Sequence, residues 1–233
     1  MCFSENMSYF NACLLFGTGI YALPSYRLSI PAIYFSIKEL LQGLFYKYLD
    51  DKDILNKLAS LSWLHISFQP LFYNMLFSHW TQEFKYWNII FIICLLFGLY
   101  FVTILKEYDI QNDEECKPRI KKDDLCMPTG AYMGEYHVGY RFKQDNTSFY
   151  YSWLPWTILF FAPPLFTKIR NIAIIWIIIA YSIWAIYDIS LGKFPDPINN
   201  LNNVGEKSAI WCFFTFVIAF VILYEKKLKF FIN

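Results

Sequence analysis

Hydrophobic residues in this chain come in blocks of about twenty, separated by polar connections, and blocks of that length suit membrane-spanning helices. The blocks predict helices at residues 7–25, 28–48, 54–77, 86–105, 150–167, 171–191 and 207–224. Pro155, Pro163 and Pro164 interrupt the fifth block, so six helices with a re-entrant fifth segment remain an alternative. We therefore expect an all-α integral membrane bundle of about seven helices, forming a single polytopic domain over residues 1–233.

Basic residues are concentrated in the short connections on one side of these helices. If successive helices alternate in direction, Arg27, Lys85, Lys168 and Arg170 all fall on the side of the basic C-terminal segment. Positive charge in short loops favours the inner side of a membrane. We therefore expect the N-terminus outside, the C-terminus inside and an external loop at residues 106–149.

The expected external loop carries residues with several chemical options. Cys116 and Cys126 are close enough in sequence to close a short disulfide, and Asn146 begins an acceptor sequence for N-glycosylation. With His137, the two cysteines supply at most three metal ligands and lack a Cys-x-x-Cys pair, which argues against zinc. His137 and Trp211 are candidates for the outer mouth of the bundle. We predict no metal and no cofactor.

Lys38, Glu39 and Gln42 lie in the middle of the second hydrophobic block. A charged residue at the centre of a spanning helix costs roughly 2.5 to 3.5 kcal/mol, whereas each Leu, Ile or Phe returns only about 0.3 to 0.6 kcal/mol. The block therefore inserts well only if its charged groups find partners. This predicts a polar site inside the bundle.

Two titratable residues of neighbouring helices are expected to meet in that site. Glu39 and His65 each lie eleven residues from the start of their helix, a rise of about 16 Å, so both fall near the middle of the bilayer. Gln42 and Gln69 lie one turn beyond them on the same faces. Two interpretations stay open: the four side chains hydrogen-bond the helices to each other, or they form a proton or ligand site.

Short motifs along the chain resemble those of a known family. They are Met1–Ser4, Glu39–Gln42, Leu64–Pro70, Asn74 and Ala209–Cys212. In this order they resemble an uncharacterised family of small polytopic membrane proteins from bacteria and large DNA viruses. The resemblance implies a bundle of about seven spans and marks the motif positions as important. It implies no reaction.

Composition narrows the function without naming it. The chain is 57% hydrophobic with a formal net charge of +1, so no basic face points to a nucleic-acid partner. No nucleophile elbow, phosphate-binding glycine loop or His-Glu-x-x-His helix occurs in the sequence. Three functions remain open: binding or transport of protons or a small polar solute, membrane-embedded catalysis on a lipid, and a structural or assembly role. The expected partners are the lipid bilayer and a small polar or lipid ligand.

Overall fold

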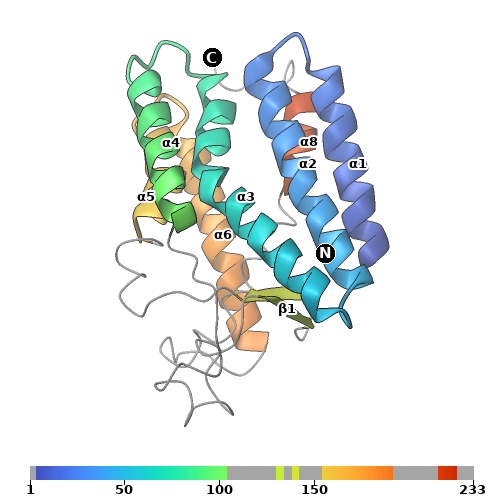
Figure 1. The fold of residues 1–233 in the computed structure, drawn as a ribbon. Helices are drawn as coiled ribbons and strands as arrows, with labels where there is room; N and C mark the ends of the chain where they lie inside the picture. The colour runs from blue at the N-terminus through green and yellow to red at the C-terminus, as the bar shows by residue number, and fades with distance from the viewer. Residues whose placement is uncertain (1–3, 104–129, 134–137, 142–153, 191–214, 225–233) are drawn as a thin grey trace.

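The computed structural model describes residues 4–103, 130–133, 138–141, 154–190 and 215–224. This part contains seven helices, each of which overlaps one of the seven segments expected from the sequence (Figure 1). They are α1 (Glu5–Tyr21), α2 (Tyr26–Lys47), α3 (Lys52–Ser78), α4 (Trp87–Thr103), α5 (Leu154–Leu165), α6 (Arg170–Ser190) and α8 (Thr215–Leu223). The helical class is therefore confirmed. Over the residues that the structure describes, none of the helices combines the length and the hydropathy that crossing a membrane requires.

The helices run lengthwise beside one another, with α3 in contact with α2, α4 and α5 (Figure 1). Helix α8, far away in sequence, packs against α1 and α2. Local capping sets two helix starts: the side chain of Ser4 accepts a hydrogen bond from the Met7 amide, and that of Asp51 accepts one from the Ile54 amide. These contacts bring α1, α2, α3 and α8, which carry the polar residues discussed below, to one side of the bundle.

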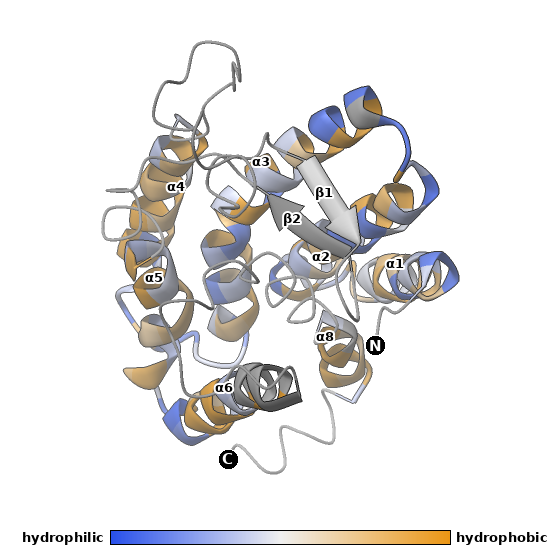
Figure 2. Ribbon diagram, turned by 90° about the horizontal axis from the view of Figure 1, so that it is seen from below, coloured by the Kyte–Doolittle hydropathy of each residue, from blue (hydrophilic) through white to orange (hydrophobic). Residues whose placement is uncertain are grey.

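A two-stranded antiparallel sheet accompanies the helices. Strand β1 (Gly130–Met133) pairs with β2 (Val138–Arg141), with Gly130 opposite Arg141. The strands contact α3 and α2 and lie at the end of the bundle seen in Figure 2. The expectation of an all-α chain with a simple external loop did not include them. Strands of four residues give too few alternating positions to be recognised in a sequence.

Close backbone approach locks α1 against α2 and α3 against α4. A Cβ atom added to Gly19 would lie 2.6 Å from the Ile33 side chain, and one added to Gly43 would lie 2.5 Å from the Tyr9 ring. A Cβ atom on Gly98 would lie 2.5 Å from the Phe68 ring. Small residues at such contacts let helices pack closely, which is the usual way helices associate in lipid.

The described bundle buries both apolar and polar side chains and exposes many large apolar ones. On α1, Ser8 and Thr18 are buried, whereas Phe10 and Tyr21 are more than half exposed. Isoleucine or leucine side chains are likewise exposed along α4 and α6, while the interior holds an apolar cluster that includes Phe35, Trp63 and Phe160. The described bundle therefore exposes a large apolar surface around an interior that combines apolar and polar side chains.

Candidate functional site

Lys38 and Glu39, two neighbouring ionisable residues of α2, lie inside the bundle. Lys38 is 2% exposed, and Glu39 and Gln42 are fully buried in the second half of the helix. The Thr215 hydroxyl of α8 donates a hydrogen bond of 2.8 Å to Oε1 of Glu39. This contact joins residues 176 positions apart and ties α8 to α2. A buried carboxyl group with a hydroxyl donor is the chemical centre of the candidate site.

His65 of α3 forms a reciprocal contact with Tyr34 of α2. Its Nε2 atom lies 2.8 Å from the Tyr34 carbonyl oxygen, and the Tyr34 hydroxyl donates to the carbonyl oxygen of His65. Because a carbonyl oxygen can only accept, Nε2 must carry a proton, and in the neutral imidazole Nδ1 then carries the lone pair. The Tyr34 ring also stacks on His65, with centroids 4.0 Å apart, and on Phe72, at 3.7 Å. These contacts hold α2 to α3.

The structure gives the two residues of the expected Glu39–His65 contact separate hydrogen-bond partners. His65 pairs with Tyr34, which lies five residues before Glu39, or about 7.5 Å along α2. Five residues also turn a helix by about 140°, so Glu39 points toward α8 while Tyr34 points toward α3. Counting residues from the helix ends captured neither this offset nor this rotation.

The remaining predicted site residues divide into two groups. Gln42 and Gln69 are both buried, one turn beyond Glu39 and His65 on their own helices. The others lie outside the described residues; they are Cys116, Cys126, His137, Asn146 and Trp211. In the described part of the chain, no three His, Cys, Asp or Glu side chains are grouped so that they could hold a metal ion.

Two prolines each leave a backbone carbonyl group without its helical hydrogen-bond donor. In both cases, a side chain of the neighbouring helix donates the hydrogen bond instead. Pro70 of α3 has no N–H for the carbonyl of Ile66, and the Trp156 indole of α5 donates to that oxygen at 2.9 Å. In α5, Pro163 likewise leaves the carbonyl of Leu159 without its helical donor. The Asn74 side-chain amide donates to that oxygen at 2.8 Å. The prolines of both helices are thus accommodated by a reciprocal contact between α3 and α5.

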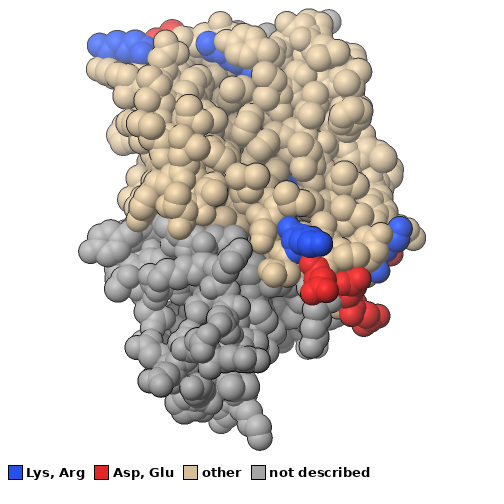
Figure 3. Space-filling model, in the orientation of Figure 1, with Lys and Arg blue, Asp and Glu red and all other residues tan. Residues whose placement is uncertain are grey.

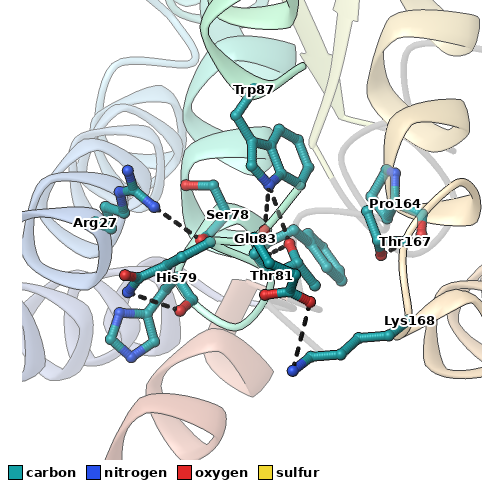
Figure 4. A network of polar contacts seen from close by, with 11 residues as sticks. Arg27, Ser78, His79, Thr81, Glu83, Trp87, Pro164, Thr167 and Lys168 are labelled. Carbon is teal, nitrogen blue, oxygen red and sulfur yellow. Dashed lines mark hydrogen bonds and ion pairs between the residues drawn. The ribbon is translucent and has the colours of Figure 1, made fainter. Parts of the chain in front are cut away.

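A polar network ties together three helix connections at one end of the bundle (Figure 4). The Arg27 guanidinium donates to the Ser78 carbonyl oxygen at 3.0 Å, and the Ser25 hydroxyl lies 3.0 Å from Nδ1 of His79. Lys168 pairs with Glu83 at 3.5 Å, and both side chains are exposed. The connections α1–α2, α3–α4 and α5–α6 therefore lie at the same end, as alternating helices require.

A family model described as a family of unknown function, DUF5765, matches residues 15–230. The chain belongs to this family. No curated protein and no solved structure matches it. The expectation of an uncharacterised family is confirmed to that extent. The match contains α2 to α8 entirely, so both the Glu39–Thr215 contact and the Tyr34–His65 contact fall within the DUF5765 region.

Sequence reasoning missed the partners of the predicted residues in this DUF5765 member. Thr215 begins the apolar run of α8, and one threonine at the edge of such a run gives no sign of its partner. Tyr34 is one of 18 tyrosines, so its type did not single it out. The Asn74 and Pro70 pair was recognisable as a motif, but the carbonyl groups that the prolines free became meaningful only beside α5.

Proposed function

We propose that the chain is a polytopic integral membrane protein whose helices face lipid with their outer surfaces. The support is the distribution of exposed apolar side chains. Each described helix exposes large apolar side chains. Those exposed on α4 include Ile89, Ile92, Leu96 and Leu99. In water, leaving such surface unburied costs about 25 cal/mol per Å² relative to burial. In hydrocarbon this cost disappears, and the small and polar side chains turned inward are those that join helices in lipid.

Charge distribution also favours a membrane. On the face drawn in Figure 3, Lys, Arg, Asp and Glu gather near the two ends of the described bundle, and the broad band between is nearly free of charge. The 22 residues of α2 and the 21 of α6 rise about 33 and 32 Å, close to the thickness of a hydrocarbon core of about 30 Å. Lys38, Glu39 and Gln42 lower the hydropathy of α2, but they are buried and would not meet lipid.

The charged residues at the two ends of the bundle also suggest how the chain is oriented across the membrane. The network of Figure 4 joins the helix connections at one end of the bundle. In or beside these connections lie four basic residues, Arg27, Lys85, Lys168 and Arg170. We assign that end to the inner side of the membrane. The opposite end, between α2 and α3, carries exposed Asp50 and Asp51. This arrangement corresponds to an N-terminus outside.

Within this bundle, we assign to Glu39 the binding and transfer of protons, alone or together with a small polar solute. The observation that carries this function is a fully buried carboxyl group in the second half of α2, held by the Thr215 hydroxyl of a distant helix. Ionisable groups at such depth are expensive and commonly belong to proton or ion pathways. A hydroxyl donor stabilises the negative carboxylate, and the carboxyl group can take up a proton when the pathway delivers one.

Proton flux in liposomes tests this function. The full chain is reconstituted with a pH-sensitive dye inside, and an acid-outside gradient is imposed while potassium and valinomycin clamp the voltage. We expect faster acidification than in empty liposomes, and Glu39→Gln should return the rate to the empty level because an amide cannot exchange a proton in this way.

Two variants serve as comparisons for Glu39→Gln. Glu83→Gln removes an exposed carboxylate of the α3–α4 connection and should leave the rate unchanged. Thr215→Val removes the hydroxyl donor but keeps the carboxyl group, so flux should persist with an altered pH dependence. A wild-type rate equal to that of empty liposomes, or full flux in Glu39→Gln, would refute the proposed function.

A further inference from the structure

Two buried polar atoms on one side of α3 have no hydrogen-bond partner within the described part of the chain: Oγ of Ser62 and Nδ1 of His65. Ser62 is 2% exposed and His65 is 6% exposed. A buried polar atom left without a partner costs about 1 to 3 kcal/mol. Two such atoms on residues three apart in one helix can be satisfied by one group that bonds to both.

Ser62 and His65 are neighbours on the helix surface. Residues three apart differ by about 60° around a helix axis, and their Cβ atoms are about 5 to 6 Å apart. One oxygen atom that hydrogen-bonds to two polar atoms can join groups up to about 5 Å apart. The spacing on α3 therefore suits a single bridging oxygen.

The contact with Tyr34 determines which chemistry fits. Nε2 of His65 is held by the Tyr34 carbonyl oxygen and carries a proton, so in the neutral ring Nδ1 can only accept a hydrogen bond. The Ser62 hydroxyl can donate one. A group that donates to His65 and accepts from Ser62 at the same time is a neutral hydroxyl. A carboxylate or phosphate would place negative charge against the Nδ1 lone pair, and an ammonium group could not accept from Ser62.

We infer that Ser62 and His65 bind a neutral hydroxyl group, of water or of a small alcohol, at the contact between α2 and α3. This site is separate from the Glu39–Thr215 contact, because Glu39 turns toward α8. The inference holds whether or not Glu39 transfers protons, so the experiment below and the flux experiment can fail independently.

The Nδ1 resonance of His65 in ¹⁵N NMR provides a direct test. The full chain, labelled with ¹⁵N-histidine and reconstituted in lipid nanodiscs, has only three histidines, and His79→Gln and His137→Gln variants assign them. A hydrogen bond to Nδ1 moves its resonance upfield from the position of a bare imine nitrogen. We expect the upfield position, and we expect Ser62→Ala to move the resonance back toward the bare position.

Glycerol and 1-butanol distinguish the two sources of the hydroxyl. A saturable shift on adding either probe, with about fivefold weaker apparent affinity in Ser62→Ala, identifies an alcohol site, since fivefold corresponds to one neutral hydrogen bond. An upfield resonance that responds to D₂O but to neither probe identifies bound water. Ser60→Ala is the matched control, because Ser60 lies on the same helix but is exposed and bonded to the Asn56 carbonyl oxygen.

Lys38 is the competing donor within the chain, since its charge acts on His65. If Lys38→Met, and not Ser62→Ala, moves the resonance to the bare position, the lysine is the donor and the hydroxyl site is refuted. A resonance at the bare position that no probe changes, or one of a doubly protonated imidazole, also overturns the inference.

Discussion

Individual polar residues in this bundle act mainly by completing backbone hydrogen bonding. Trp156 and Asn74 each donate to a carbonyl oxygen that a proline has deprived of its helical partner. Tyr34 and His65 each bond to the other's backbone. In a low-dielectric interior, an unsatisfied carbonyl group is costly, so these side chains contribute most where the helix itself cannot supply a donor.

The contact between Trp156 and Ile66 should depend on Pro70. Trp156→Phe keeps an aromatic ring but removes the N–H, and should lower the free energy of unfolding in detergent by about 1 to 3 kcal/mol. In a Pro70→Ala background, residue 70 regains an N–H that can bond to Ile66, so the same change should cost less. The measurement is a double-mutant cycle on unfolding midpoints in sodium dodecyl sulfate.

Trp80→Phe is the control for this cycle. The Trp80 indole N–H has no hydrogen-bond partner within the described residues, so its loss should cost little in either background. Equal costs of Trp156→Phe with and without Pro70 would show that the indole does not replace the missing helical donor.

At the scale of elements, close packing of α1 against α2 depends on a small-residue face. Gly19 lies where α1 meets the Ile33 side chain and the Ser29 carbonyl oxygen of α2. Two residues away, Gly17 points outward and has nothing within 4 Å of an added Cβ atom. The same helix therefore offers one glycine required by packing and one that is not.

Alanine at these two glycines should have opposite effects. Gly19→Ala places a Cβ atom 2.6 Å from Ile33 and should lower the free energy of unfolding by about 1 to 3 kcal/mol. Gly17→Ala should raise it by about 0.5 to 1 kcal/mol, because alanine favours the helix. The two variants are compared by unfolding midpoints in the same detergent. Equal effects would mean that α1 and α2 do not approach as closely as described.

Helix positions were predictable at this scale, but helix registers were not. Expected and described bounds of α2 differ by two residues at the start and one at the end, because a hydrophobic block is a local property of the sequence. The offset of α3 against α2 depends instead on the side chains that pack between them, such as Tyr34 against Phe72. With this offset, Glu39 bonds to Thr215 and His65 bonds to Tyr34.

On the scale of the whole described bundle, large apolar side chains lie on the outer surface, and the interior combines an apolar core with buried polar groups. On the face drawn in Figure 3, the charges lie near the ends. An outer surface this apolar supports the proposed placement of lipid around the middle of the bundle. The basic connections held together by Arg27 and Lys168 form one of the ends.

Extraction behaviour tests the placement in a membrane. After expression, membranes washed with alkaline carbonate should keep the chain in the pellet, and only detergent should release it, because the exposed apolar surface would otherwise meet water. A peripheral membrane protein expressed in the same cells is the control and should be washed off. Release of the chain by carbonate alone would contradict an integral membrane protein.

The sequence by itself determined where the helices lie, which end carries the short basic connections, and that α2 brings charged groups into an apolar setting. Each of these is a property of residues close together along the chain. Only the tertiary structure decided the partners: Thr215 for Glu39, Tyr34 for His65, and Trp156 with Asn74 for the freed carbonyl groups. Partnership depends on the rotation and offset of whole helices, which are set by contacts between residues as many as 176 positions apart.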